Sequence, residues 1–263
     1  MSEKIKLVVR ADDAGSSWSS NMGCLEACKN GIARSVEVMM PCAWVSHAAT
    51  LFNDHPDIDI GIHLTLTSEW DSIKWRPLTA AKSLVDEGGN FFPLLAPRQG
   101  DNRQSLAQSN WSFDDILNEL RAQMTLGIAM FPRATHISTH MLQHILLFDE
   151  RVGAAVADMC QEFGLKDDPF GFELPRLEGY PKFPRSVHLR ISAFVEQLSE
   201  LSPGTYIFID HPAVESAELA ATGHTGYEDV QQDRWTCLQT LTSLEVQQQV
   251  EHLGIELISY KDL

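Results

Sequence analysis

Four short apolar runs in this sequence each end on a carboxylate or a histidine. The runs are KLVVRADD at 6–13, IDIGIHLTL at 58–66, ATHISTH at 134–140 and TYIFIDHP at 205–212. Each run is typical of a buried β-strand whose hard polar groups come at its C-terminal end. The C-terminal ends of the strands in an α/β barrel meet on one face. We therefore expect one pocket to contain Asp12, Asp13, His63, His140 and His211.

Two aspartates and several histidines in one pocket predict a metal site. One carboxylate with two imidazoles is a facial ligand set with open positions, and it suits Zn²⁺, Co²⁺, Mn²⁺, Ni²⁺ or Fe²⁺. Water on such a metal loses a proton near neutral pH, and the metal polarises a carbonyl group. Of two adjacent aspartates, usually only one ligates well, so the other is free to take the proton. This division predicts a metal-assisted hydrolase.

Each of these polar groups also has a purely structural interpretation. Asp12 and Asp13 can form a turn that caps the next helix, and a lone His63 in an apolar strand is usually a satisfied core residue. The histidines at 136, 140 and 144 are spaced as on one helix face, although THISTH alternates as a strand does. Core packing does not demand a polar interruption at the end of every strand, so the four coincidences together favour a site.

The elements that would position these residues alternate between strands and helices. Further strands are expected at 35–40 and 255–259. Helices are expected at 18–29, 46–53, 113–127, 149–163, 192–201 and 230–252. We predict an α/β fold: an irregular single-domain (β/α) barrel of about seven strands over residues 1–263, with its active site at the strand C-termini. Two irregular insertions interrupt it, at about 68–110 and 166–187. The aromatic residues of the first can stack on a sugar ring or simply anchor the loop.

Composition excludes several classes of partner. The net charge of −16 and the lack of a basic stripe argue against nucleic acid or an anionic membrane. No apolar run approaches the ~18 residues of a membrane span, and no signal peptide is visible. Five cysteines without a CxxC pair indicate a reducing, cytoplasmic setting. The same net charge of −16 favours a neutral or cationic substrate. The sequence leaves the oligomeric state open, a homo-oligomer included.

The ordered set of motifs resembles the YdjC-like family, which includes chitooligosaccharide deacetylases and is distantly similar to NodB-type polysaccharide deacetylases. The likeness covers nearly the whole chain. It rests on VVRADDAG at 8–15, GIHLTL at 61–66, Thr135-His136 with His140 and His144, and His211-Pro212. Asn21, Gly31, Arg76-Pro77-Leu78, Arg234 and LISY at 257–260 add to it.

The resemblance implies an irregular (β/α) barrel that hydrolyses an N-acetyl group on an amino sugar or short oligosaccharide, releasing acetate. Asp13, His63 and His140 match the ligands of one divalent metal ion (Zn, Mg, Mn, Co or Ni). Asp12 matches the general base, and His211 matches the histidine proposed as general acid. As substrate-binding residues we predict Trp75, Arg76, His136, His144 and Arg234. The expected partner is a small neutral N-acetylated sugar.

The chain departs from the family pattern at several positions. Family members usually carry an aspartate two residues before the third ligand, where this chain has Ser138, and more histidine just after it, where it has Met141 and Leu142. The usual glycine after His-Pro is Ala213, and Ala14 stands where phenylalanine is common. The metal ligands are intact, whereas the surroundings of the ligands and the sugar pocket are changed. We therefore expect weaker or shifted activity on diacetylchitobiose.

Two other enzyme classes use similar residues. A non-haem iron oxygenase has the same two-histidine, one-carboxylate set, but normally in a β-sandwich and with a short His-x-Asp spacing, which this chain lacks. A metal-dependent phosphoesterase also combines metal ions with paired carboxylates, and the scarcity of Arg and Lys near these motifs argues against it. A non-catalytic sugar-binding protein would need neither Asp12 nor His211.

Overall fold

The protein is built around one sheet of parallel strands. The computed structural model describes residues 4–141, 149–167, 173–181 and 185–263. In this part of the chain the strands are β1 (Ile5–Ala14), β2 (Ser35–Val38), β3 (Asp59–Leu64), β4 (His136–Thr139), β5 (Gly204–Asp210) and β6 (Glu256–Ile258). Their order is β4-β3-β2-β1-β5, and β6 pairs with the first half of β1. All the pairings are parallel, so the strand C-termini lie along one edge.

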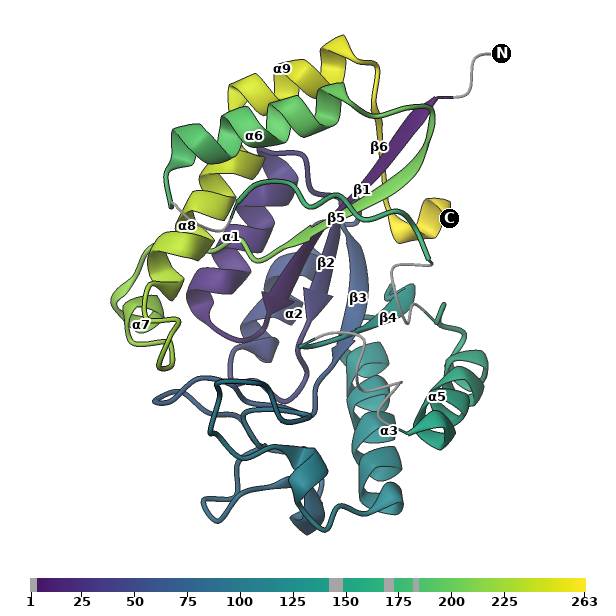
Figure 1. The fold of residues 1–263 in the computed structure, drawn as a ribbon. Helices are drawn as coiled ribbons and strands as arrows, with labels where there is room; N and C mark the ends of the chain where they lie inside the picture. Colours follow the sequence, from purple (N-terminus) through teal and green to yellow (C-terminus); the bar gives the residue numbers. More distant parts are fainter. Residues whose placement is uncertain (1–3, 142–148, 168–172, 182–184) are drawn as a thin grey trace.

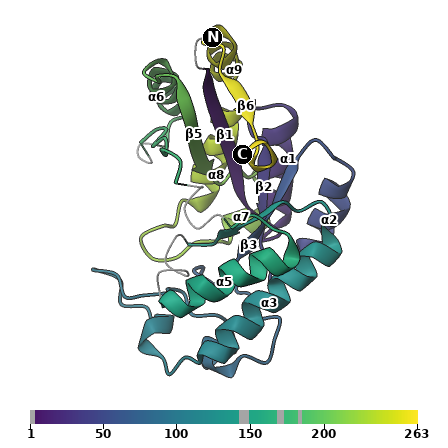
Figure 2. The ribbon, with the colours of Figure 1, turned by 90° about the vertical axis from the view of Figure 1, so that its right-hand side faces the viewer.

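Helices cover this sheet and connect its strands. They are α1 (Trp18–Lys29), α2 (Val45–Asn53), α3 (Phe113–Met130), α5 (Glu150–Phe163), α6 (Val187–Ser199), α7 (Ala217–Ala220), α8 (Val230–Leu241) and α9 (Leu244–His252). Helices α1, α6, α8 and α9 lie beside β1 and β5, whereas α3 and α5 lie beside β3 and β4 (Figures 1 and 2). No described helix is both long and apolar enough to cross a membrane.

The central strands are buried on both faces of the sheet. Every residue of β2, β3 and β4 is buried, as expected for a parallel sheet between helices. The four apolar runs recognised in the sequence are β1, β3, β4 and β5, and THISTH forms a strand rather than a helix. An α/β domain with a parallel sheet is therefore confirmed.

The sheet is a half-barrel rather than the expected barrel of about seven strands. Six strands occur in the described residues, and β4 and β5 form the two ends of the main path. Within the described residues, only single parallel bridges extend it there, from His136 to Lys166 and from Arg176 to Ile207. Segments that are this short cannot supply the continuous strand pairing that closes a barrel.

Most helix ends follow the predicted signals, with two corrections. Ser112 accepts a hydrogen bond from the backbone of Asp115 at the start of α3, and Gly164 ends α5 with φ +69°. The single helix expected at 230–252 is wrong, because Ser243 adopts an extended conformation and caps a separate α9. Helix α3 also continues past Gly127, where a Cβ atom would come within 2.6 Å of Ile62. Gly127 therefore permits close packing and does not end the helix.

The insertion at 68–110 is packed against the body. It contains two short 3₁₀ helices, Lys82–Leu84 and Leu106–Gln108. Its aromatic residues Trp75, Phe91 and Phe92 are buried, so they anchor the loop. Trp70 is also largely buried, but it lines the cavity described below.

Candidate functional site

A bulge in β1 brings two consecutive aspartates to one site. Ala11 pairs with Val36 and Ala14 with Val38, so three steps along β1 match two along β2. Asp13 at this bulge has φ +70°, a left-handed conformation that aspartate tolerates better than most residues. Successive residues of a regular strand point to opposite faces. The extra residue lets Asp12 and Asp13 line the same cavity.

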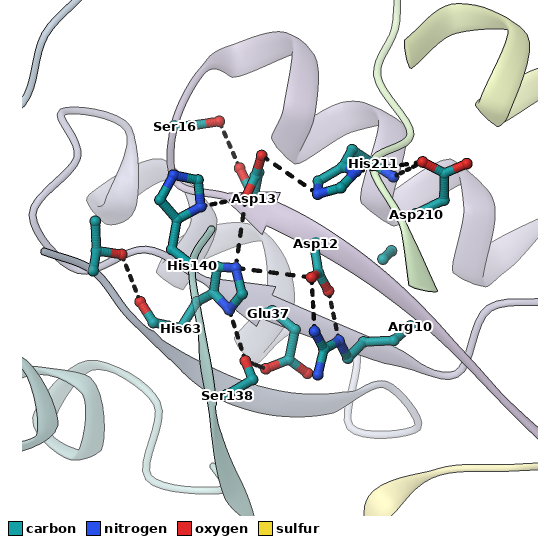
Figure 3. Close-up of polar contacts among 12 residues, drawn as sticks. Arg10, Asp12, Asp13, Ser16, Glu37, His63, Ser138, His140, Asp210 and His211 are labelled. Atoms are coloured by element: carbon teal, nitrogen blue, oxygen red, sulfur yellow. Dashed lines mark hydrogen bonds and ion pairs between the residues drawn. The ribbon is translucent and has the colours of Figure 1, made fainter. Parts of the chain in front are cut away.

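Asp13, His63 and His140 lie together as a candidate set of metal ligands. They come from β1, from β3 and from the residue after β4, and one ligand atom of each lies within 4.8 Å of the others. The Asp13 Oδ1 atom is 3.6 Å from His63 Nε2 and 3.2 Å from His140 Nδ1 (Figure 3). One carboxylate and two imidazoles fit a divalent ion such as Zn²⁺ and leave coordination positions open.

Oxygen atoms hold the outer nitrogens of both histidines. The His63 Nδ1 atom is 2.7 Å from the Ser138 hydroxyl, and the His140 Nε2 atom is 2.9 Å from a carboxylate oxygen of Glu69. Partners of this kind fix the ring orientation and the tautomer of metal-binding histidines. Ser138 therefore contacts the side of His63 that faces away from Asp13.

The charges of the three groups differ. Burial raises the pKa of Asp13, but Arg234, His211 and His140 lower it well below the usual value. Burial lowers the pKa of His63 to about 4. Burial also lowers the pKa of His140, but the carboxylates of Glu69 and Asp13 overcome it and raise this pKa to about 10. Near neutral pH, Asp13 is thus a carboxylate and His63 is neutral, whereas His140 must lose a proton before it can bind a metal.

Arg10 holds Asp12 beside these groups. Its Nε atom donates to Asp12 Oδ1 over 2.7 Å, and its Nη2 atom donates to Oδ2 over 2.9 Å. This two-point contact fixes the plane of the carboxylate. Asp12 Oδ2 remains 3.8 Å from His63 Nε2. Asp12 is therefore next to the candidate ligands, and Arg10 fixes the orientation of its carboxylate.

His211 lies near the second carboxylate oxygen of Asp13, the one that His63 and His140 do not contact. Its side chain is 38% exposed, and its Nε2 atom is 4.0 Å from Asp13 Oδ2. The Asp210 carboxylate lies 3.3 Å from His211 Nδ1, accepts a bond from the His211 backbone, and accepts another from the Tyr180 hydroxyl. Asp210 therefore orients the ring so that Nε2 faces the site. The two residues after His211 pack closely against Gly23 of α1, since a Cβ atom on Gly23 would be 2.4 Å from Ala213 Cα.

These groups line one cavity of about 320 Å³. The predicted residues that line it are Asp12, Asp13, His63, His140, His211 and Arg234. The other lining residues are Glu69, Trp70, Arg98, Thr139, Met141, Arg176, Ile209, His224 and Tyr227. The five residues expected in one pocket from the strand ends are thus brought together. Arg98 and Arg176 come from the two insertions, so the cavity contains more positive charge than the sequence motifs indicate.

Of the described residues that were predicted to bind substrate, Arg234 alone lines the cavity. Arg234 lines the cavity, donates to Asp13 Oδ2 over 2.6 Å, and lies over the Trp70 ring. Trp75 is buried and donates to the backbone of Thr67, and Arg76 donates to Asn90 and Gly88. His136 is fully buried against Glu37 and Tyr260. None of these last three lines the cavity, whereas His144 and Leu142 lie outside the described residues.

Besides Arg98 and Arg176, four charged residues around the site were not predicted: Arg10, Glu37, Glu69 and Asp210. Three of them left a signal. Arg10 and Glu37 interrupt the apolar runs of β1 and β2, and a charge inside a buried strand needs a partner. Asp210 stands at the end of β5, directly before His211, where the strand-end argument also applies. Glu69 lies in an irregular segment that carries no pattern.

Comparison with known proteins gives a consistent family assignment. The model of the YdjC-like protein family matches residues 6–252. A chitooligosaccharide deacetylase of Yersinia enterocolitica is 30% identical over 97% of this chain and 98% of its own length. A carbohydrate deacetylase of Clostridium beijerinckii is also 30% identical, over 98% of this chain and 100% of its own.

Solved structures share the fold. An Enterococcus faecalis protein, provisionally named a cellobiose-phosphate cleavage protein, superposes with a TM-score of 0.75 at 21% identity. The match covers 98% of both chains. At this identity the likeness concerns the fold alone.

Proposed function

This chain belongs to the YdjC-like protein family, and we propose that it is a metal-dependent hydrolase that removes an N-acetyl group from an amino sugar or short oligosaccharide. The products would be acetate and a free amine. Full-length relatives named chitooligosaccharide deacetylase and carbohydrate deacetylase support the hydrolysis of an amide bond on a sugar.

One observation carries the proposal. Asp13, His63 and His140 form a candidate metal site, and Asp12 and His211 line the same cavity. Hydrolysis of an amide needs a base to take a proton from water and an acid to protonate the leaving nitrogen. The site holds a carboxylate, Asp12, and an imidazole, His211, next to the candidate ligands, and each has an orienting partner. A protein that only binds sugar would need neither the base nor the acid.

Each residue has a role that follows from its position. Asp13, His63 and His140 would hold a divalent ion, which would acidify a water molecule and supply positive charge to stabilise the developing oxyanion. Asp12, held by Arg10, takes the proton of the attacking water. His211, with Nδ1 held by Asp210, gives a proton from Nε2 to the amide nitrogen as the C–N bond breaks. Arg234 holds Asp13 in place and forms one wall with Trp70.

The cavity also supports a second candidate, a metal-dependent phosphoesterase. The sequence argued against it through the scarcity of Arg and Lys near the motifs, but Arg98 and Arg176 line the cavity. Arginine is a preferred partner of phosphate groups. The parallel sheet gives no comparable support to a non-haem iron oxygenase, whose usual scaffold is a β-sandwich.

The test is a release assay on protein stripped of metal and reloaded with Zn²⁺, Mg²⁺, Mn²⁺, Co²⁺ or Ni²⁺. Acetate and phosphate are measured over N-acetylated sugars, sugar phosphates and simple esters. Asp12→Asn is the matched control, because it keeps the size of the side chain and loses the base. Acetate release from at least one N-acetylated sugar by the wild type alone supports the proposal. Phosphate release without acetate from any sugar favours the phosphoesterase.

A further inference from the structure

We propose that Glu37 is a positioning residue for His63 and acts on it through the hydroxyl of Ser138. The carboxylate would fix the His63 tautomer so that Nε2 presents a lone pair to the metal site. The proposal rests on the function proposed above. It assigns a task to a buried carboxylate on β2 that neither the motifs nor the cavity lining identifies.

The contacts form a continuous chain across three strands. The Ser138 hydroxyl on β4 donates to Glu37 Oε2 on β2, and it lies 2.7 Å from His63 Nδ1 on β3 (Figure 3). Glu37 and Ser138 are fully buried, and His63 is 1% exposed. Glu37 and Ser138 do not line the cavity either, so solvent does not compete for the contact between them.

Counting protons gives the direction of each bond. A serine hydroxyl carries one proton, and an ionised carboxylate can only accept. Because the proton of Ser138 goes to Glu37, the Ser138 oxygen must accept from His63. His63 then carries its proton on Nδ1, so Nε2 is bare where it faces Asp13. The carboxylate thus sets the tautomer through two hydrogen bonds in series.

Strand β3 has room for this carboxylate only because of a glycine. Gly61 pairs with Glu37 in the sheet register. A Cβ atom at Gly61 would lie 2.1 Å from Glu37 Oε2 and 2.6 Å from His136 Nε2. The Glu37 side chain therefore crosses β3 over Gly61 and reaches β4. There its second oxygen accepts from His136, 2.8 Å away.

The two histidines of the site are then supported in parallel ways. Glu69 contacts His140 directly, whereas Glu37 reaches His63 through Ser138. Ser138 is the position at which this chain lacks the family's usual aspartate. The charge missing from β4 is supplied by β2, so Ser138 and Glu37 together replace one carboxylate.

Two single variants and one double variant test the idea. In Glu37→Gln, the amide oxygen accepts from His136, and the amide NH₂ faces Ser138. The Ser138 proton is then redirected to His63 Nδ1, which moves the histidine proton to Nε2. Ser138→Ala removes the link itself. In Glu37→Gln/Ser138→Asp, the new carboxylate on β4 accepts directly from His63, while the new amide on β2 donates to that carboxylate. Glu162→Gln is the control, because Glu162 forms an exposed ion pair with Arg121.

Two measurements apply to each protein: the ¹⁵N NMR shifts of His63 without metal, and the Zn²⁺ affinity by calorimetry. We expect Nδ1–H in the wild type, Nε2–H in Glu37→Gln, and Zn²⁺ binding about 10- to 100-fold weaker in both single variants. The double variant should recover the tautomer and most of the affinity. Urea unfolding confirms that each variant is folded.

Unchanged affinity and tautomer in Glu37→Gln overturn the proposal, whatever Ser138→Ala does. A loss that the double variant does not recover also overturns it, since it would indicate a merely structural role. If the wild type binds no Zn²⁺ but shows Nδ1–H, the proposed metal function fails while the positioning by Glu37 stands.

Discussion

Removing the charge of Glu69 should change how many protons the protein releases when it binds a metal. Glu69 is buried, and its carboxylate lies 2.9 Å from His140 Nε2. Burial lowers the pKa of His140, but Glu69 and then Asp13 raise it to about 10. Glu69→Gln keeps an oxygen that accepts the same hydrogen bond and loses the charge. The variant should therefore lower the pKa of His140 without freeing the ring.

The size of the effect follows from this pKa. At pH 8.5, a group with a pKa of about 10 holds about 0.97 of a proton, which a metal at His140 must displace. Loss of one close opposite charge lowers the pKa by about 1 to 3, which leaves about 0.76 of a proton or less. His63, with a pKa of about 4, is already neutral and contributes none. The released proton therefore belongs to His140 alone among the candidate ligands.

Calorimetry of Zn²⁺ binding in buffers of different ionisation enthalpy gives the number of protons released. The difference between wild type and Glu69→Gln is the informative quantity, because protons from other groups cancel in it. We expect the variant to release at least about 0.2 fewer protons at pH 8.5. In the wild type, affinity should rise about tenfold per pH unit between pH 6 and 9 as His140 deprotonates. Equal release by the two proteins, or wild-type affinity independent of pH, would refute the reasoning.

Three further substitutions test the roles assigned to the site. His63→Ala should lower metal occupancy at least tenfold in elemental analysis, since it removes a ligand, and full occupancy would show that the site is wrong. Asp12→Asn should keep its metal while kcat falls roughly 10²- to 10⁴-fold, and loss of metal would reverse the roles of the two aspartates. His211→Ala should slow amide substrates far more than activated esters, whose leaving groups need no proton; equal losses on both would mean that His211 only positions the substrate.

The sequence predicted which reactive side chains share the pocket better than it predicted the hydrogen bonds that hold them in place. Asp12, Asp13, His63, His140 and His211 could be placed in one pocket because each follows an apolar run, and the C-termini of parallel strands share an edge. That argument needs only the direction of the strands. It does not need their order or their exact register.

The supporting contacts could not be predicted from the local sequence pattern, because they depend on which strands are neighbours in the sheet. Glu37 reaches Ser138 because β2, β3 and β4 are neighbours and because Gly61 opens the path, and neither fact is local. The half-barrel could not be told from a closed barrel, because both give alternating strands and helices. The break at Ser243 depends on one serine hydroxyl competing for a backbone donor within a helical pattern.

The bulge in β1 makes the site depend on the number of residues in the strand as well as on their identity. Deleting one residue between Ala11 and Ala14 would restore an uninterrupted ladder with β2. The change would suit strand pairing, yet it would remove either Asp12 or Asp13, because these are the only residues between the two alanines. Single-residue deletions at this point should therefore be tolerated by the fold and not by the reaction. In the evolution of such chains, the spacing of these few residues would be held as firmly as the aspartates themselves.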